Sequence, residues 1–316
     1  MHVNIHGPNS KECVKGTYYM NGYKKIIKSQ KLRFAILRAL KFVPDKQMLK
    51  LQYRIKLGRP LNLNNPQRYT EKIQWYKINY RNPVMMKCVD KYHVREYVEG
   101  KGLGNILNEL YFVVDSPEKI DFASLPEKFA LKVTNGSETN IFCKDKSKLD
   151  EAATRQKLRE YLAMGNASAG REWAYEGSSK LIIAERFMED DTNPDGSISD
   201  YKFLCFNGEP HYIVYDCDRF AGHKRNIYDL DWNNLDIRTD CPQIDRDIPK
   251  PENIDAMIEI ARKLSEDFPA VRVDLYDIKG RIVFGELTFY PWSGYVQYTP
   301  DSFDFELGKL FPLVKY

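Results

Sequence analysis

The chain has few cysteines and histidines, and those it has are scattered. Its six cysteines form no CxxC pair and no metal-finger spacing, so we expect reduced thiols, as is typical of the cytosol. Its five histidines are not clustered, which argues against a histidine-based zinc site. No apolar run approaches the roughly 18–20 residues that span a bilayer. The first residues also lack the apolar stretch of a signal peptide.

A strong excess of charge of one sign is also lacking. The formal net charge is +4, from 48 basic and 44 acidic side chains, which argues against a dedicated nucleic-acid binder. The basic residues are concentrated in 31–58, where apolar residues at helical spacing predict a helix interrupted at Pro44. A basic amphipathic helix suits an anionic membrane surface. The alternative is a surface helix whose lysines are simply solvated.

The apolar fraction of 43% is sufficient for a folded core, and its pattern changes along the chain. Helical periodicity is expected around Ile73 and Trp75, and over 83–100 and 253–268. Short apolar runs predict strands, with Asn207-Gly208 as a hairpin turn. The predicted strands cover 129–133, 141–143, 181–187, 201–206 and 211–214. The sequence thus predicts an α+β protein with an N-terminal extension (1–60), a helical part (61–125) and a mixed region (126–316).

Residues 271–288 form the most informative stretch, because they read as two strands joined by a tight turn. Alternation along the strands sends Arg272 and Asp274 to one face, and Glu286 and Thr288 to one face of the partner strand. Carboxylate oxygens suit Mg²⁺, and a neighbouring arginine suits a transferring phosphoryl group. The alternative is an edge hairpin whose charges face water.

Three further features carry charge in apolar surroundings. Lys132, in the predicted strand 129–133, precedes a loop of small polar residues, an arrangement that suits phosphate but is also found in ordinary hairpins. The strand 181–187 contains Glu185, and a purine could pair with the backbone of such a strand. Lys202 lies inside an apolar run, where an unpaired charge would be costly.

The order of these features resembles the ATP-grasp superfamily, and in particular the TupA-like branch, named after a teichuronopeptide biosynthesis protein and regarded as amidoligases. The resemblance covers about residues 60–311. The stretches that carry it are Asn65-Pro66, Glu71-Lys72-Ile73-Gln74-Trp75, Asp90-Lys91-Tyr92, Val94-Arg95, Leu125-Pro126-Glu127-Lys128-Phe129, Asp200-Tyr201-Lys202-Phe203, Cys205-Phe206-Asn207-Gly208 and Phe284-Gly285-Glu286-Leu287-Thr288-Phe289.

This resemblance implies an ATP-grasp fold, in which two α+β subdomains clamp ATP, with a helical N-terminal extension. It also implies roles for individual residues. Two lysines would reach the phosphates, residues 135–139 would cover them, 185–187 would contact adenine, and Glu189 or Asp191 would bind the ribose. The implied nucleotide-binding residues are Lys91, Lys132, Asn135, Gly136, Ser137, Glu185, Arg186, Phe187, Glu189, Asp191 and Lys202.

The resemblance further implies that Asp274, Glu286 and Thr288 bind Mg²⁺ and that Arg272, with Lys132, serves catalysis. Two departures stand out. Thr288 occupies a position that is often Asn, so one metal ion would be held less tightly. Glu138 adds an acid to a loop that often has more glycine, and it would repel phosphate if it pointed inward.

The implied function is that of an ATP-dependent carboxylate–amine ligase that works through an acyl phosphate. Its expected substrates are a small-molecule or glycan carboxylate, such as a uronic acid of a cell-surface polysaccharide or its precursor, and an amino acid or another amine. The expected location is the cytoplasm, with peripheral contact to the inner face of the membrane or a biosynthetic complex through 31–58. The alternatives are a glycosyltransferase of polysaccharide biosynthesis and a catalytically degenerate nucleotide-binding scaffold protein.

Overall fold

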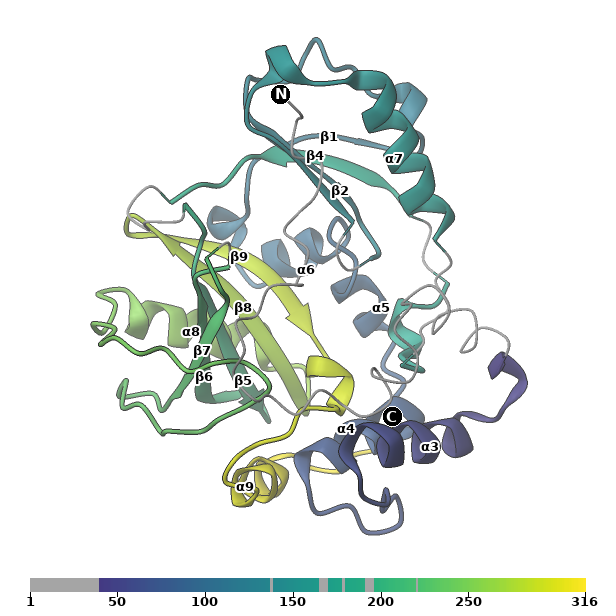
Figure 1. Cartoon of the computed structure of the whole chain (residues 1–316), viewed down its shortest axis with the longest axis vertical. Coiled ribbons are helices and arrows are strands. Elements are labelled where there is room, and N and C mark those ends of the chain that lie inside the picture. Colours follow the sequence, from purple (N-terminus) through teal and green to yellow (C-terminus); the bar gives the residue numbers. More distant parts are fainter. Residues whose placement is uncertain (1–39, 137–138, 165–169, 178–179, 191–195, 220) are drawn as a thin grey trace.

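The computed structural model describes residues 40–136, 139–164, 170–177, 180–190, 196–219 and 221–316. They form two antiparallel sheets flanked by helices, which confirms the predicted α+β class (Figure 1). No helix in these ranges is long and apolar enough to cross a membrane.

The first sheet has the strand order β1-β4-β2-β3. Helix α7 (Glu151–Ala163) packs on it, with Leu158 and Tyr161 buried against Phe129 and Leu131 of the sheet. Asp150 begins this helix by accepting a hydrogen bond from the amide of Ala153, at 2.9 Å. The strands are β1 (Leu110–Val114), β2 (Phe129–Val133), β3 (Asn140–Cys143) and β4 (Ile182–Arg186).

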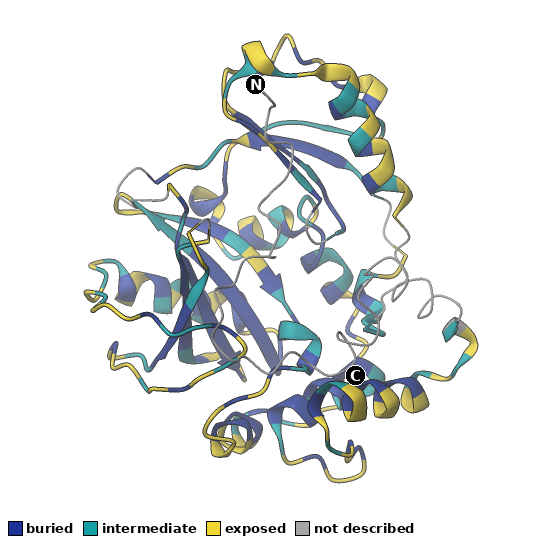
Figure 2. Ribbon diagram, in the orientation of Figure 1, coloured by how far each residue is buried: buried dark blue, intermediate teal, exposed yellow. Residues whose placement is uncertain are grey.

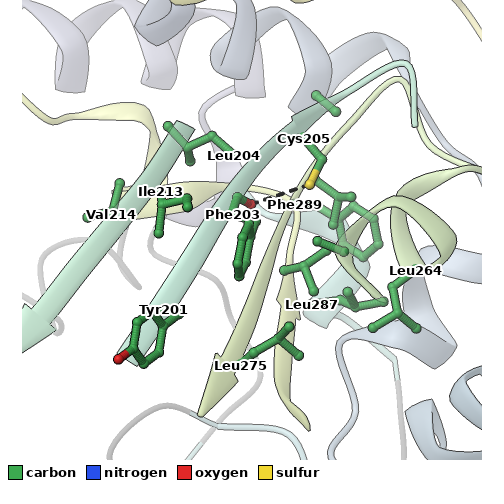
Figure 3. Close-up of a cluster of buried hydrophobic side chains, with 14 of the residues drawn as sticks. Tyr201, Phe203, Leu204, Cys205, Ile213, Val214, Leu264, Leu275, Leu287 and Phe289 are labelled. Atoms are coloured by element: carbon green, nitrogen blue, oxygen red, sulfur yellow. Dashed lines mark hydrogen bonds between the residues drawn. The ribbon is translucent and has the colours of Figure 1, made fainter. Parts of the chain in front are cut away.

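The second sheet has the order β7-β6-β5-β8-β9. Every residue of its central strand β5 is buried (Figure 2). Helix α8 (Ile254–Ser265) covers one face, where Leu264 packs among residues such as Phe203 and Phe289 (Figure 3). The strands are β5 (Asp200–Phe206), β6 (Glu209–Cys217), β7 (Lys224–Tyr228), β8 (Ala270–Ile278) and β9 (Arg281–Thr288).

The remaining α-helices pack against the second sheet or against one another. Helix α4 packs against α9, where the buried carboxylate of Asp304 accepts hydrogen bonds from the amide and hydroxyl of Thr70, at 2.9 and 2.8 Å. The α-helices are α3 (Asp45–Leu57), α4 (Tyr69–Asn79), α5 (Val84–Cys88), α6 (Val94–Gly100) and α9 (Ser302–Leu310). The 3₁₀ helices are η1 (Leu40–Phe42), η2 (Gly104–Ile106), η3 (Pro117–Lys119), η4 (Lys146–Lys148), η5 (Trp173–Tyr175) and η6 (Pro291–Gly294).

The prediction of one helix over 83–100 is wrong, because the chain leaves the helix between α5 and α6. There the carboxylate of Asp90 accepts the backbone N–H groups of Tyr92 and His93, at 2.9 and 3.0 Å. An aspartate that bonds its own following backbone competes with the helix. The amide of Lys91 donates instead to the carbonyl of Thr134, at 3.0 Å. The break thus ties residue 91 to the end of β2.

Other predicted elements agree with the structure within a few residues. The hairpin turn at Asn207-Gly208 joins β5 to β6, with both residues at positive φ. The second half of the predicted helix 31–58 is α3, whereas 31–39 lies outside the described residues. The pattern did not reveal β1, β7, α7 or α9.

Candidate active site

Lys132 and Glu185 lie next to each other on strands β2 and β4 of the first sheet. The lysine ammonium donates to the Glu185 carboxylate at 2.7 Å, and Arg95 lies 3.8 Å from the other carboxylate oxygen. Glu185 is buried, whereas the Lys132 side chain remains 18% exposed. A partly exposed lysine held by a buried carboxylate is positioned to meet an anion from the solvent side.

Lys91 comes from the break between α5 and α6 and lies against the loop that follows β2. Its ammonium donates to the carbonyl of Gly136 at 2.6 Å, and burial lowers the pKa of this lysine. Glu286 opposes the shift, while Lys132 adds to it, so the charges of both sheets act on Lys91. In the same loop Asn135 is buried and donates to the carbonyl of Tyr175 at 2.9 Å. Ser137, Glu138 and Asp191 lie outside the described residues.

The hairpin of β8 and β9 brings four predicted residues together. Arg272 stands opposite Thr288 in the register, and Asp274 stands opposite Glu286. The Arg272 guanidinium donates to Asp274 at 2.6 and 2.7 Å, to Glu286 at 3.0 Å and to Thr288 at 3.1 Å. The face predicted from alternation is therefore present, with arginine at its centre.

A register shift follows Asp274 in this hairpin, and the residue that permits it is Gly285. A Cβ on Gly285 would lie 2.8 Å from the carbonyl oxygen of Asp274, closer than such atoms approach in proteins. Bulges of this kind redirect the neighbouring side chain and are frequent beside active sites. Here the neighbour is Glu286, whose side chain is 54% exposed.

Two carboxylates and a hydroxyl are the donor set that this hairpin offers to a cation. Oxygen ligands of this kind fit Mg²⁺, which commonly takes one or two carboxylates and completes its shell with water and phosphate oxygens. The described residues contain no group of three or more His, Cys, Asp or Glu side chains that could hold a metal ion. Two carboxylates and one hydroxyl leave positions of such a shell open, so these residues fit a cation that is shared with a phosphate ligand.

Lys202 is buried among three carboxylates, which explains a lysine within an apolar strand. Its ammonium lies 2.8 Å from Asp200, 3.2 Å from Asp274 and 3.8 Å from Asp216. Burial raises the pKa of Asp274, but the charges of Arg272 and Lys202 outweigh it and hold that pKa below its usual range. Lys202 therefore pairs with a group of carboxylates that includes Asp274, and a direct contact with phosphate would require it to leave them.

The polar segment after Val214 proves to be part of the sheet. Arg225 lies on β7 and is buried, with its guanidinium 2.6 Å from the carboxylate of Asp216 on β6. Arg219 pairs with Asp200. Arg225 thus neutralises Asp216 inside the sheet. The five residues of β7 are too few to show a strand pattern clearly in the sequence.

The residues expected to bind the nucleoside lie at the end of β4. Arg186 pairs with Glu109 at 2.5 Å and the ring of Phe187 contacts that of Phe142, with centroids 6.0 Å apart. Glu189 pairs with Lys128 at 2.6 Å on the surface. These three residues therefore lie at the same end of the first sheet, beyond the Lys132–Glu185 pair.

The fold thus combines two antiparallel sheets with helices, and its charged residues gather on β2, β4, β8 and β9. The chain belongs to the TupA-like ATP-grasp family, whose model matches residues 71–312. This confirms the predicted ATP-grasp fold and family. No protein with a curated description matches the sequence.

Solved structures similar to this chain include ligases with distant sequences. The D-alanine–D-alanine ligase of Bacillus anthracis is 14% identical, with 64% of this chain and 57% of that one covered and a TM-score of 0.40. The L-amino acid ligase of Bacillus licheniformis is 14% identical, with 67% and 43% covered and a TM-score of 0.40. The N5-carboxyaminoimidazole synthase of Aspergillus clavatus, in complex with ADP and 5-aminoimidazole ribonucleotide, is 10% identical, with 70% and 50% covered and a TM-score of 0.40. The chain thus spans about half the length of these structures.

Proposed function

We propose that the chain uses ATP to activate a carboxylate as an acyl phosphate and joins it to an amine. The observation that carries this proposal is the position of Arg272, bonded to Asp274, Glu286 and Thr288 on a hairpin whose charges act on Lys91. Family membership supplies the ATP-grasp class. The residues themselves supply the cations and carboxylates that phosphoryl transfer needs.

In this proposal Lys91 and Lys132 bind the phosphates, and the loop that begins with Asn135 and Gly136 covers them. Both lysines are already oriented, Lys91 by the Gly136 carbonyl and Lys132 by Glu185. Residues 185–187 contact the adenine, and Glu189 or Asp191 accepts the ribose hydroxyls. Orientation before binding favours affinity, because less side-chain freedom is lost when the nucleotide arrives.

Asp274, Glu286 and Thr288 would hold Mg²⁺, which neutralises charge on the phosphates when it is bound. Arg272 then places its guanidinium beside the γ-phosphoryl group. A substrate carboxylate oxygen attacks that phosphorus and ADP leaves. The amine nitrogen next attacks the carbonyl carbon of the acyl phosphate, phosphate leaves, and the nitrogen loses a proton. No side-chain nucleophile is required, so the protein acts by positioning and charge.

The substrate class follows from the family resemblance, which is to amidoligases associated with cell-surface polysaccharides. We therefore infer a uronic acid of such a polysaccharide or its precursor as the carboxylate, and an amino acid or another amine as its partner.

Calorimetry of ATP binding in the presence of Mg²⁺ tests the proposal, with Lys132→Ala and Glu286→Gln as variants. Micromolar binding that both variants lose would support nucleotide use, and ADP release can then be screened with amino acids and uronic acids. Absence of binding by the folded chain would refute the ligase and favour a glycosyltransferase. Binding without ADP release under any pair of substrates would favour the degenerate scaffold.

A peripheral membrane contact is favoured by one surface of α3. Helix α3 buries Leu49 and Tyr53 against the protein, yet its outer side exposes Leu51 and Ile55, which are 49% and 48% accessible. The outer side also carries exposed cations, namely Lys46, Lys50 and Arg54. Apolar side chains among cations suit the surface of an anionic bilayer.

A further inference from the structure

The backbone beyond β9 has an unusual conformation next to Arg272. In η6 the residues Trp292 and Ser293 are left-handed, with φ of 49° and 56°, and Gly294 follows with φ of 66°. Residues other than glycine avoid this region because their Cβ crowds the backbone. Two of them in succession persist only where the surroundings hold them, and such strain is concentrated at functional sites.

Two side chains of helix α4 hold this turn. The ammonium of Lys77 donates to the carbonyl and to the hydroxyl of Ser293, both at 2.9 Å, and to the Gln74 side chain at 3.1 Å. Gln74 in turn donates to the carbonyls of Ser293 and Gly294, at 3.0 and 3.1 Å. The turn fits so closely that a Cβ at Gly294 would run into the Gln74 side chain. Glu172 completes the group by accepting from the Ser293 hydroxyl.

The turn places the indole of Trp292 against two buried arginines, Arg272 of β8 and Arg225 of β7. The guanidinium carbon of Arg272 lies 5.3 Å from the ring centroid, and that of Arg225 lies 4.8 Å from it. Both distances are within the range of cation–π contacts. Arg272 is thus fixed by its carboxylates on one side and by an aromatic ring on the other.

We propose that Lys77 is a positioning residue for Arg272: it holds the left-handed turn that presses Trp292 against the arginine beside the reacting phosphoryl group. This proposal rests on the proposed function for the role of Arg272. The link from Lys77 to Arg272 runs through Ser293 and Trp292, and it makes helix α4 a support of the proposed active site.

The chemistry of Lys77 gives this arrangement a pH dependence. Burial lowers the pKa of Lys77 to about 7, and the charged groups facing it are Glu172, which opposes the shift, and Lys56 of α3, which adds to it. The rings of Tyr290 and Tyr295 lie 6.0 and 4.9 Å from its ammonium. Below about pH 7 the ammonium has three N–H donors for the turn, and above it the neutral amine has two.

The first test compares Lys77→Met with Lys72→Met. Lys72 lies on the same helix and donates to a backbone carbonyl, that of Phe311 at 2.6 Å, so it is a matched control away from the turn. We expect Lys77→Met to lower kcat for ADP release at least tenfold with an unchanged KM for ATP, and to abolish a pH limb near 7. Lys72→Met should retain the parent kcat and the pH limb near 7. Equal losses in the two variants, or wild-type kcat and pH profile in Lys77→Met, would overturn the proposal.

The second test needs no substrate and therefore separates this proposal from the proposed function. The emission of Trp292 is isolated as a difference between two proteins. The emission of Trp292→Phe is subtracted from that of the parent, and the emission of Lys77→Met with Trp292→Phe is subtracted from that of Lys77→Met. We expect the Trp292 emission to change with pH around 7 in the parent, and in Lys77→Met to be red-shifted, more accessible to iodide and independent of pH. If the Trp292 emission is the same in the parent and in Lys77→Met, Lys77 does not position Trp292, even if the protein hydrolyses ATP. If Lys77→Met changes the Trp292 emission as expected but the parent does not bind ATP, the proposed function is refuted and the positioning of Trp292 by Lys77 is not.

Discussion

The ammonium of Lys132 lies 2.7 Å from the carboxylate of Glu185, across the strand pair β2 and β4. Because Glu185 is buried and lies 3.8 Å from Arg95 as well, its charge is shared between two cations. Lys132 thus keeps hydrogen-bonding capacity for a further anion. In the proposed site that anion is a phosphate of ATP, with Lys91 as the second cation.

Replacing Lys132 by methionine is expected to weaken ATP binding by about 10- to 100-fold. The reason is that hydrogen bonds to charged groups contribute about 1.5–3 kcal/mol, and each 1.4 kcal/mol corresponds to a factor of ten. Calorimetric titration with ATP and Mg²⁺ measures the change. Lys148→Met serves as the control, because this lysine belongs to the same subdomain but is 71% exposed and pairs with Asp145. An equal effect of both changes would contradict a phosphate contact by Lys132.

Glu286→Gln should raise the Mg²⁺ concentration that half-saturates ATP binding by about tenfold or more, since the amide keeps the shape but loses the charge that a hard cation requires. Glu286 is half-exposed, so its replacement leaves no buried charge unpaired and the chain should remain folded. Titration with Mg²⁺ at fixed ATP gives the result. Glu259→Gln, an exposed acid on α8, should change nothing. Unchanged Mg²⁺ dependence in Glu286→Gln would remove this residue from the metal site.

Asp216→Asn should destabilise the chain by about 3–5 kcal/mol, the usual cost of leaving a buried charge unpaired. The charge concerned is the guanidinium of Arg225, whose side chain is 7% exposed and 2.6 Å from Asp216. Urea unfolding measures the loss. The matched change Asp245→Asn breaks the exposed pair with Lys224 and should leave the urea midpoint unchanged.

The same pair predicts how stability responds to acid. Burial raises the pKa of Asp216, yet the charge of Arg225, the hydrogen bond with His223 and the charge of Lys202 together outweigh it, so the folded-state pKa is lowered from the model-peptide value near 3.9. A carboxyl with a lowered pKa stabilises the fold at pH values above the unfolded-state pKa, and this stability is lost as the pH falls below about 4. The parent should therefore lose stability from pH 5 to pH 2 more steeply than Asp216→Asn. Parallel curves would show that Asp216 does not drive the acid response.

The sequence predicted the shared face of the β8–β9 hairpin well, because strand alternation fixes which side chains lie on one face. Arg272, Asp274, Glu286 and Thr288 are therefore found together. It could not predict that Lys202 pairs with Asp200, Asp216 and Asp274, since those contacts depend on the order of three strands that the pattern does not specify.

The helical part was harder to predict for a local reason. Periodicity suggested one helix over 83–100, but the side chain of Asp90 bonds its own backbone and Lys91 joins β2. The hydrogen bond from Lys77 to Ser293 joins segments that are more than two hundred residues apart in the sequence. The sequence around Lys77 and around Ser293 contains no signal for this contact, so it is known only from the folded structure.

The surface of α3 predicts binding to vesicles that contain anionic lipid. Each lysine or arginine near such a surface contributes about 1 kcal/mol, so Lys50→Glu with Arg54→Glu should weaken co-sedimentation with phosphatidylglycerol vesicles by at least about tenfold. Leu51→Gln with Ile55→Gln should also weaken it, because both side chains are exposed and would enter the interface. Lys263→Glu, an exposed change on α8, is the net-charge control for Lys50→Glu alone, because each reverses one cation. If charge reversal on α3 and on α8 weakens vesicle binding equally, the attraction is not specific to α3. If neither pair of α3 changes reduces vesicle binding, α3 is an ordinary solvated helix.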